Sequence, residues 1–259
     1  IIRYLILPDA ELSKIGRFSP WVEAVWNPIE EIIERIESQS HRRCIKAHLA
    51  LDGLPYFPQV KYVIVGRDPR DVFMSMWNHY FNYVDSFYDE INGDPNRIGA
   101  PMPRCPDDIH VFWEQWITCG WFEWEREGYP FWGNMHHTQS YWDYKHLPNI
   151  FFVHYNNLLN DTHAEIRRLA EYLEVNASDA HIDKIVALTS FNHMKKHSDV
   201  LVGESRDFKG GSKAFINKGT NGRWKNVLSD VDLELYDKAA QRVLSSDCRH
   251  WLEIGQFTD

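Results

Sequence analysis

The chain has 259 residues, 44% hydrophobic and 25% charged, which is the balance of a globular protein able to bury a large core. Its formal net charge of −9 argues against nucleic acid as the main partner, because binding a polyanion needs a basic surface. A small anionic ligand in a locally basic pocket is compatible with that charge. The 14% aromatic content, with eleven Trp, predicts a core or a pocket walled by rings.

The cysteines and the start of the chain carry two further expectations. The four cysteines form no CxxC pair and no framework spacing, which favours reduced thiols in a cytoplasmic protein. No apolar run approaches the length of a membrane span. The first residues, IIRYLIL, have the pattern of an apolar helix interior that no strand precedes. We therefore expect a further segment upstream of Ile1.

Short apolar runs that predict strands alternate with helical patterns along the chain. The strands are expected at 44–48, 62–65 and 150–155. The helices are expected at 22–36, 71–84, 109–124, from Ile166 to Leu173 after a cap at Asn160 or Asp161, and after a capping box of Ser229 and Asp232. This alternation predicts an α/β fold in a single domain, residues 1–259, with a mainly parallel β-sheet flanked by helices.

Two stretches have no sustained period. Residues 89–107 contain four prolines and predict a loop or lid. Residues 202–222 are rich in Gly, Lys, Ser and Asn, which is typical of a mobile segment that contacts an anion.

Residues 61–80, KYVIVGRDPRDVFMSMWNHY, predict a buried strand, a basic turn and a capped helix. Asp68 suits the N-cap of that helix, and Asp71 stands three residues later. Arg67 lies in the turn at the carboxyl end of the strand, where the helix N-terminus favours an anion. Ser75 adds a hydroxyl donor two turns into the helix. A surface turn with one solvated arginine would show the same pattern.

Residues 44–55, CIKAHLALDGLP, place a cation near a titratable imidazole. In a strand, Lys46 and His48 share a face, which suits a reaction that needs anion stabilisation and proton removal. The alternative is a hydrogen-bonded core histidine beside a lysine that reaches solvent.

Residues 215–226, FINKGTNGRWKN, interleave glycines with cations, an arrangement in which the backbone can approach a phosphate. A charged surface loop would look similar. In TSFNHM, Phe191 and Met194 offer flat or soft apolar surface for a ring. His193 and His197 have the spacing of helical metal ligands, but such pairs are more often solvated, and no metal is expected.

In this order, these stretches resemble the cytosolic-type sulfotransferases, which use 3′-phosphoadenosine 5′-phosphosulfate (PAPS). The K-T-H strand end of that family supplies its catalytic histidine and is similar to Lys46-Ala47-His48. Its V-x-R-N-P-x-D-V segment, with a serine eight residues after the arginine, grips the 3′-phosphate of the donor. Arg67 and Ser75 have the same spacing.

The resemblance extends to the residues that hold the nucleotide. The aromatic-Y-E-[DE] strand end of the family places a tyrosine on the adenine, which implies that role for Tyr155. The family's T-S-F-x-x-M and R-K-G-x-x-G-D-W-K-N segments contact the adenine and close over the 3′-phosphate. The matching donor-binding residues are Thr189, Phe191, Met194, Asn217, Lys218 and Gly219.

The resemblance implies a P-loop-NTPase-like sulfotransferase fold, with PAPS as co-substrate and no metal. Its activity would be sulfuryl transfer to a hydroxyl or amine of a small, hydrophobic acceptor. His48 would act as general base and Lys46 would stabilise the transferred group, while His137 matches the family's acceptor-pocket histidine more loosely. The family's P-K-S-G-T-T-W loop, with its catalytic lysine, is expected upstream of Ile1.

Three departures from the family pattern affect donor binding and assembly. Asn217 stands where the family has arginine, and Arg223 replaces an aspartate. The family's dimer motif survives only in part between Lys225 and Glu234, which leaves the oligomeric state open. Two alternatives follow: a non-catalytic adenosine-bisphosphate-binding protein, and a nucleotide kinase-like phosphotransferase.

Overall fold

The computed structural model describes residues 1–13, 15–23, 28–95, 97, 99–203 and 206–258. Contacts divide the chain into two compact units. The first unit comprises Ile1–His48, Asn82–Arg97 and Asp161–Gly219, and the second comprises Leu49–Phe81, Ile98–Asn160 and Thr220–Asp259. Among the described helices, none is both long enough and apolar enough to cross a membrane.

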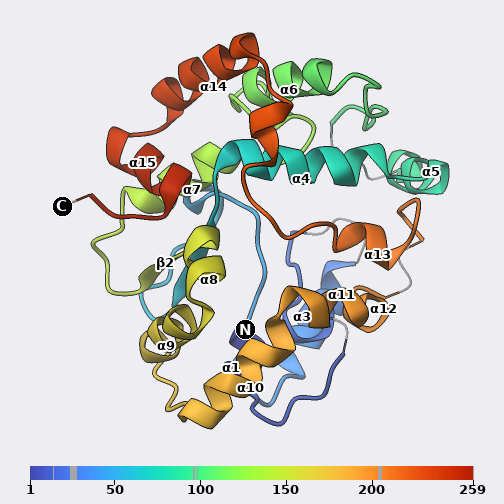
Figure 1. Cartoon of the computed structure of the whole chain (residues 1–259). Helices are drawn as coiled ribbons and strands as arrows, with labels where there is room; N and C mark the ends of the chain where they lie inside the picture. The colour runs from blue at the N-terminus through green and yellow to red at the C-terminus, as the bar shows by residue number, and fades with distance from the viewer. Residues whose placement is uncertain (14, 24–27, 96, 98, 204–205, 259) are drawn as a thin grey trace. The chain divides into compact units, whose positions relative to one another are not determined.

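The first unit is helical, and the second contains the sheet (Figure 1). The helices of the first unit are α1 (Ile2–Ile6), α2 (Ile15–Phe18), α3 (Ile29–Glu37), α5 (Asp85–Gly93), α9 (Thr162–Tyr172), α10 (Asp179–Thr189), α11 (Phe191–Lys196), α12 (Ser198–Leu201) and α13 (Ser212–Phe215). The elements of the second unit are η1 (Leu51–Gly53), β1 (Tyr62–Gly66), α4 (Pro69–Phe81), α6 (Ile109–Thr118), α7 (Asn134–Trp142), β2 (Ile150–His154), α8 (Tyr155–Asn160), η2 (Arg223–Asn226), α14 (Asp230–Val243) and α15 (Ser246–Ile254).

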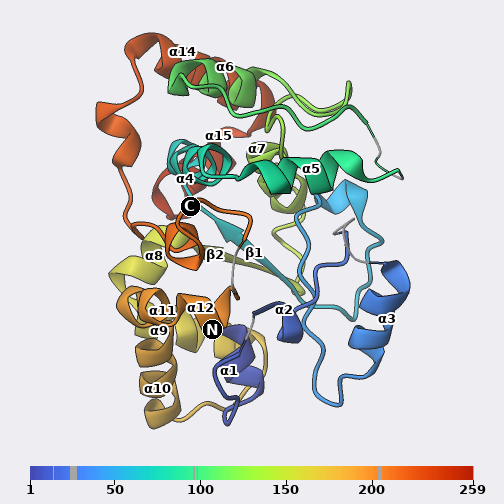
Figure 2. The same ribbon diagram turned by 90° about the vertical axis from the view of Figure 1, so that its right-hand side faces the viewer.

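The sheet of the second unit confirms two of the predicted strands. β1 and β2 pair in parallel, from Tyr62 opposite Ile150 to Gly66 opposite His154 (Figure 2). Each strand then runs directly into a helix, β1 into α4 and β2 into α8. The fold is therefore α/β with a parallel sheet flanked by helices, as the sequence predicts. The carboxyl ends of the two strands lie at the same edge.

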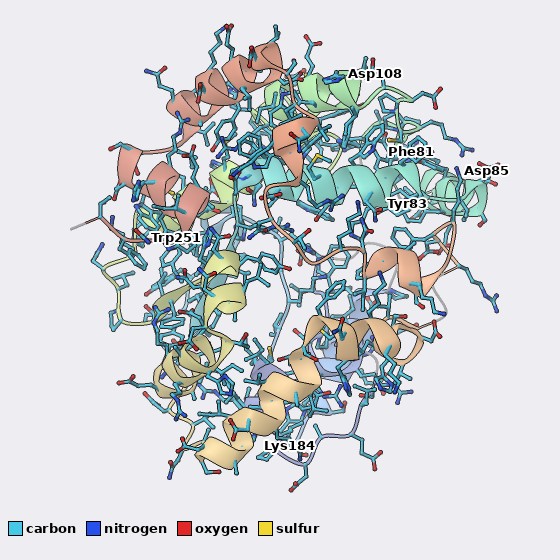
Figure 3. The ribbon with its side chains drawn as sticks, in the orientation of Figure 1. Phe81, Tyr83, Asp85, Asp108, Lys184 and Trp251 are labelled. Atoms are coloured by element: carbon cyan, nitrogen blue, oxygen red, sulfur yellow. The ribbon has the colours of Figure 1, made fainter. Side chains whose placement is uncertain are left out.

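An aromatic cluster holds α15 against the sheet. The ring of Trp251, labelled in Figure 3, lies 5.2 Å from both the Phe152 and Trp142 rings. A Cβ atom at Gly66 would lie 2.3 Å from the Trp251 ring, so only glycine lets β1 approach α15 this closely. The buried His154 accepts the Asn156 N–H at Nδ1 and donates from Nε2 to the Leu252 carbonyl, so it is a structural histidine.

A second cluster packs α4 against α6. Phe73 is fully buried and contacts the Phe112 and Trp113 rings at 5.2 and 4.8 Å. The Trp113 indole also donates to the Asp232 carbonyl on α14, at 3.0 Å. α6 and α14 accordingly lie side by side in both ribbon views (Figures 1 and 2). The aromatic-rich sequence has built a core here, as expected of large buried rings.

The first unit has its own core between α9 and α10. Ile166 and Ile185 are fully buried, and Leu5 of α1 is 1% exposed. His181 bonds the Tyr4 carbonyl at 2.8 Å, which ties α10 to α1. The helix predicted in the first residues is confirmed.

The helix caps predicted for α9 and α14 are present. Asp161, rather than Asn160, caps α9 by accepting the Ala164 N–H at 2.9 Å. Ser229 and Asp232 form the predicted capping box of α14.

Three predicted helix boundaries are wrong, two of them for local reasons. The helix expected at 22–36 begins at Ile29, because Pro28 occupies its N-cap with an extended backbone; residues 24–27 lie outside the described part of the chain. The helix expected at 109–124 ends at Thr118, because the Glu125 carboxylate accepts the N–H groups of Trp121 and Phe122 and closes a turn. The helix expected at 71–84 ends at Phe81.

The two stretches predicted as loops are partly structured. α5 extends into the first stretch as far as Gly93, and its Phe87 ring stacks at 3.9 Å on the ring of Tyr83, which precedes the helix. Tyr83 and Asp85 are labelled in Figure 3. The second stretch contains α13 and an antiparallel bridge between Phe208 and Tyr83. The aromatic rings that hold these segments are far apart in sequence, so local patterns miss the contact.

A buried carboxylate fixes the start of α7. Glu127 is 1% exposed and accepts the N–H groups of Asn134, Met135 and His136, each at 3.1 Å. These are unpaired donors of a helix N-terminus, where a carboxylate is favourable. Burial nevertheless raises the pKa of Glu127 to about 7, and the three donors offset only part of that shift.

This pKa predicts a pH-dependent stability. Between about pH 4.5 and 7 the folded protein keeps a proton on Glu127 that the unfolded chain releases. The stabilisation from this group is therefore complete below that window and is lost as the pH rises through 7. Relative to Glu127→Gln, the wild type should lose roughly 2 kcal/mol of unfolding free energy between pH 5 and 8. Parallel pH profiles from urea denaturation would show that the carboxyl is ionised throughout.

Candidate functional site

The strand register of the second unit places Arg67 next to Tyr155. Gly66 and His154 are the last paired residues of the two strands, and each candidate residue is the first one after its strand. The Arg67 guanidinium lies over the Tyr155 ring, 4.5 Å from its centroid. The two residues thus form a cation–π pair at the carboxyl edge of the sheet, where ligands of such sheets bind.

Within the described part of the chain, the Arg67 guanidinium donates its hydrogen bonds to neutral acceptors. It donates from Nη1 to Ser75 Oγ at 3.2 Å, from Nε to Asn221 Oδ1 at 2.9 Å, and from Nη2 to the Thr220 carbonyl at 3.0 Å. Burial lowers the pKa of Arg67, which the negative charge of Asp71 opposes. The charge of a half-buried guanidinium that donates only to neutral partners is not neutralised by a carboxylate, so it is available to pair with an anion.

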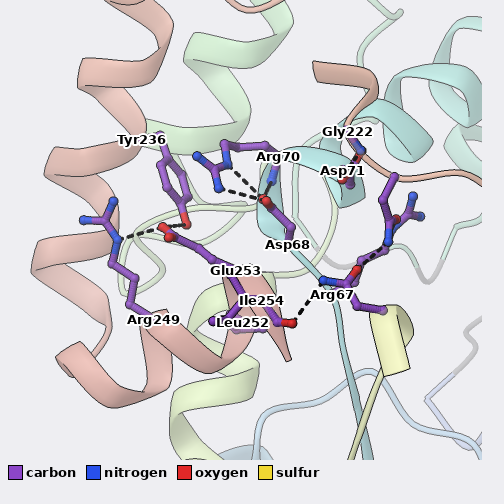
Figure 4. A network of polar contacts seen from close by, with 12 residues as sticks. Arg67, Asp68, Arg70, Asp71, Gly222, Tyr236, Arg249, Leu252, Glu253 and Ile254 are labelled. Carbon is purple, nitrogen blue, oxygen red and sulfur yellow. Dashed lines mark hydrogen bonds and ion pairs between the residues drawn. The ribbon is translucent and has the colours of Figure 1, made fainter. Parts of the chain in front are cut away.

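Arg70, three residues on, shows the opposite arrangement (Figure 4). Its Nε and Nη2 atoms donate to the two oxygens of Asp68 at 2.9 and 2.8 Å. The guanidinium also lies over the Trp224 and Tyr236 rings, at 4.0 and 4.6 Å. Asp68 caps α4 as predicted, by accepting the Arg70 N–H at 2.9 Å. Arg70 is therefore neutralised and structural, whereas the described part of the chain shows no carboxylate hydrogen-bonded to Arg67.

Asp71 has a different role from the one its position predicts. Its buried carboxylate does not complete the cap but accepts the N–H groups of Gly222 and Arg223, at 2.8 and 3.1 Å (Figure 4). The loop that contains Thr220 and Asn221 is thereby held against α4. Because both of those residues accept hydrogen bonds from Arg67, Asp71 determines where the loop meets the guanidinium.

In the first unit, Phe191 packs against the glycine-rich segment. A Cβ atom at Gly219, whose φ is +65°, would lie 2.4 Å from the Phe191 ring. On the same segment, the Asn217 carbonyl accepts a hydrogen bond from Lys195 at 2.8 Å, while Lys218 is exposed. Lys195 thus places a cation beside Asn217, the residue that stands where the family pattern has arginine.

The other two residues of the TSFNHM segment are less directly engaged. The Thr189 hydroxyl donates back to the Ile185 carbonyl at 2.8 Å, within α10. Met194 is half-buried on α11, whose N-cap is Ser190. The pair predicted as an unlikely metal site, His193 and His197, lies with its ring centroids 4.4 Å apart and the ring planes tilted by 37°. In the described part of the chain, no group of three metal-ligating side chains occurs.

The third group of candidates, Lys46 and His48, also lies in the first unit. The strand predicted at 44–48 is wrong: the segment is extended, but only Lys46 forms a bridge, to Trp21. Both side chains still share a face, because the Lys46 ammonium lies 4.5 Å from the Trp21 ring centroid and the His48 ring meets the same indole edge-on at 4.5 Å. Glu23 lies beside His48, with 3.4 Å between Oε1 and Nδ1.

His137 lies half-buried on α7 of the second unit, 5.1 Å from the Tyr141 ring. The Tyr141 hydroxyl in turn donates to the Leu49 carbonyl at 3.3 Å, so α7 anchors the segment that begins after His48 in the sequence. A cavity of about 530 Å³ lies between α7 and η1, but no predicted site residue lines it.

Three residues that hold the candidate site residues in place are not predicted from the sequence. Asn221 stands in the two-residue gap between the glycines of its loop, Asp71 looks like an ordinary helix-start residue, and Glu23 falls in a predicted helix. A polar side chain between two glycines is a usable signal, since such loops approach ligands. The other two carboxylates act on residues distant in sequence, which no local pattern reports.

Comparisons with known proteins agree on one family. A family model described as a sulfotransferase domain matches residues 9–247. A glycolipid sulfotransferase of Mycobacterium bovis is 26% identical, over 99% of this chain and 83% of its own length. Sulfotransferase 1B1 of Canis lupus familiaris is 27% identical, over 82% of this chain and 65% of its own length. The crystal structure of mouse sulfotransferase SULT7A1 complexed with PAP has a TM-score of 0.65 at 21% identity, covering 87% and 74% of the two chains.

The role of Asp71 yields a prediction for stability. Asp71→Asn replaces one of its two acceptor oxygens by an NH₂ group, which cannot accept a backbone N–H. The unfolding free energy should fall by about 1.5–3 kcal/mol. The amides of Gly222 and Arg223 should then exchange hydrogen faster, whereas the exposed Asp89→Asn serves as control. Unchanged exchange at both amides would show that Asp71 does not hold the loop.

Proposed function

The chain belongs to the sulfotransferase family, and from this premise we propose that it moves a sulfuryl group from PAPS to a hydroxyl or amine of a small hydrophobic acceptor. The observation that carries the proposal is the Arg67 guanidinium, held by three neutral acceptors and stacked on Tyr155. A charged donor fork next to an aromatic ring suits a phosphate attached to a nucleoside. The similar fold of SULT7A1, which was crystallised in complex with PAP, supports the same nucleotide class.

Recognition of the donor is assigned to two groups of residues. Arg67, Ser75 and Tyr155 would hold the 3′-phosphate and the adenine. In the first unit, Thr189, Phe191 and Met194 would contact the adenine, and Asn217, Lys218 and Gly219 would close over the phosphate. The Phe191–Gly219 packing supports this second group, and Lys195 supplies a cation beside Asn217.

Catalysis is assigned to His48 and Lys46. In an in-line transfer, His48 takes the proton of the acceptor O–H or N–H as the new bond to sulfur forms. The S–O bond to the 5′-phosphate breaks, and adenosine 3′,5′-bisphosphate leaves. Lys46 would stabilise the charge on the sulfuryl oxygens. Burial lowers the pKa of Lys46, an effect that the charge of Glu23 opposes.

The acceptor and the location are proposed at a coarser level. The glycolipid and 1B1-type relatives are both named as sulfotransferases, which supports a small-molecule acceptor, and His137 is proposed to contact it. A cytoplasmic location is supported by the four cysteines, all of which are free thiols. The family match disfavours the kinase-like alternative. The binding-only alternative rests on Asn217 and is separated from an enzyme by turnover.

The proposed base predicts a separation of binding from turnover. His48→Ala should bind adenosine 3′,5′-bisphosphate within a few-fold of wild type, because the ring does not hold the nucleotide. It should lose at least about 100-fold in transfer rate, the low end of what general-base catalysis contributes. Sulfate transfer from labelled donor measures the rate, with the exposed His163→Ala as control. A variant that keeps a tenth of wild-type turnover would rule out His48 as the base.

The proposed phosphate clamp predicts a selective loss of affinity. Arg67→Ala should weaken the 3′,5′-bisphosphate by about 1.5–3 kcal/mol, which is roughly one to two decades in Kd. Binding of 5′-AMP should change little, because AMP lacks the 3′-phosphate. Asn217→Arg should tighten the bisphosphate alone. Calorimetric titration of both nucleotides decides this, with the exposed Arg167→Ala as control; equal losses for both on Arg67→Ala would make Arg67 structural.

A further inference from the structure

We propose that Glu23 is a positioning residue for His48: its carboxylate holds the Nδ1–H of the imidazole, so that the lone pair that takes the proton of the acceptor is on Nε2. The inference rests on the proposed function, since it assigns to Glu23 a part in the reaction for which His48 is the base. Both residues lie in the first unit. Glu23 has no counterpart among the motifs that identify the sequence.

The carboxylate of Glu23 contacts His48 twice through the same oxygen. Oε1 accepts the backbone N–H of His48 and lies 3.4 Å from its Nδ1. The backbone contact fixes the carboxylate relative to the peptide that carries the ring. The ring contact is an ion-pair contact that is longer than a formed hydrogen bond, and catalytic contacts of this kind commonly tighten when substrate binds.

The surroundings make the pair partly dry. The Glu23 side chain is 13% exposed and that of His48 33%. The Trp21 indole packs edge-on against the imidazole, and the Lys46 ammonium lies over the same indole. Among the described residues, Glu23 and Lys46 are therefore the charged groups that the contacts place around His48, one of each sign.

Glu23 is ionised under the conditions in which the base must act. Burial by itself would raise its pKa, but the polar contacts with the His48 side chain and backbone and with Trp21 outweigh that effect and lower the pKa. An anion beside Nδ1 fixes the tautomer, because the nitrogen that donates to a carboxylate must carry the hydrogen. The lone pair is then on Nε2.

During the proposed reaction, the His48 ring becomes positively charged beside the Glu23 carboxylate. When His48 takes the acceptor proton on Nε2, the ring becomes an imidazolium while the bond between sulfur and the acceptor oxygen or nitrogen forms and the S–O bond to the leaving bisphosphate breaks. The carboxylate of Glu23 stabilises that imidazolium without taking up the proton, as an orienting acid does in other base–acid pairs. The sulfuryl group moves to the acceptor atom, the electron pair of the broken S–O bond stays on the phosphate oxygen of the leaving bisphosphate, and the acceptor proton ends on Nε2.

The kinetic test compares three proteins. Glu23→Gln keeps an oxygen for the His48 backbone N–H, so the fold is retained, but it removes the charge. Its kcat should fall by about 10–100-fold, the usual effect of losing such an orienting partner, with the KM for donor within a few-fold. The acid limb of its pH–rate profile should move to lower pH, because the imidazolium has lost its counter-charge. Glu30→Gln, exposed on α3, should behave as wild type. A wild-type profile for Glu23→Gln would overturn the proposal.

A second measurement reports directly which nitrogen of the His48 ring carries the proton. It thereby separates the effect of Glu23 on His48 from the effect of the Glu23 charge on Lys46. Nitrogen-15 shifts of the His48 imidazole at a pH where the ring is neutral should report the proton on Nδ1 in the wild type. Glu23→Ala should spread that proton over both nitrogens. An unchanged tautomer would overturn the role of Glu23. If the tautomer changes but His48→Ala remains active, the failure lies in the base assignment of the proposed function, and Glu23 then has no part in the reaction.

Discussion

The parallel register of β1 and β2 is the constraint on which the second unit depends. Because Gly66 pairs with His154, the first residue after each strand lies at the same edge of the sheet, and these residues are Arg67 and Tyr155. A shift of one residue in the pairing would turn the strand side chains to the opposite face and place Arg67 beside a different residue. Gly66 also allows α15 to pack against this end of β1, since only a residue without Cβ leaves room for the Trp251 ring.

The contrast between two neighbouring arginines shows how an acidic protein keeps a positive site. Arg70 is paired with a carboxylate through two hydrogen bonds and covered by rings, so its charge is consumed in holding the start of α4. Arg67 is held just as firmly, but by neutral oxygens. Net charge therefore says little about this site; what matters is whether a guanidinium has a carboxylate partner.

Buried carboxylates organise the backbone around the candidate residues in both units. Asp71 holds the glycine-rich loop against α4, Glu127 fixes the first turn of α7, and Glu23 binds the backbone of His48. In each case, the acceptor oxygens meet backbone N–H groups that would otherwise be unpaired. Three of the Asp and Glu side chains of this protein thus accept internal backbone hydrogen bonds instead of being solvent-exposed charges.

The sequence by itself determined the family, the parallel strands at 62–65 and 150–155, and the capping box of α14, and it limited the cap of α9 to two residues, because these depend on local pattern and on ordered motifs. Only the tertiary structure decided which partners the side chains find. Asp71 leaves its expected cap for a loop 151 residues away, the strand at 44–48 is no ladder, and Lys195 comes to lie beside Asn217. The physical reason is that hydrogen bonds and charges act through space, whereas helix and strand periods act along the chain.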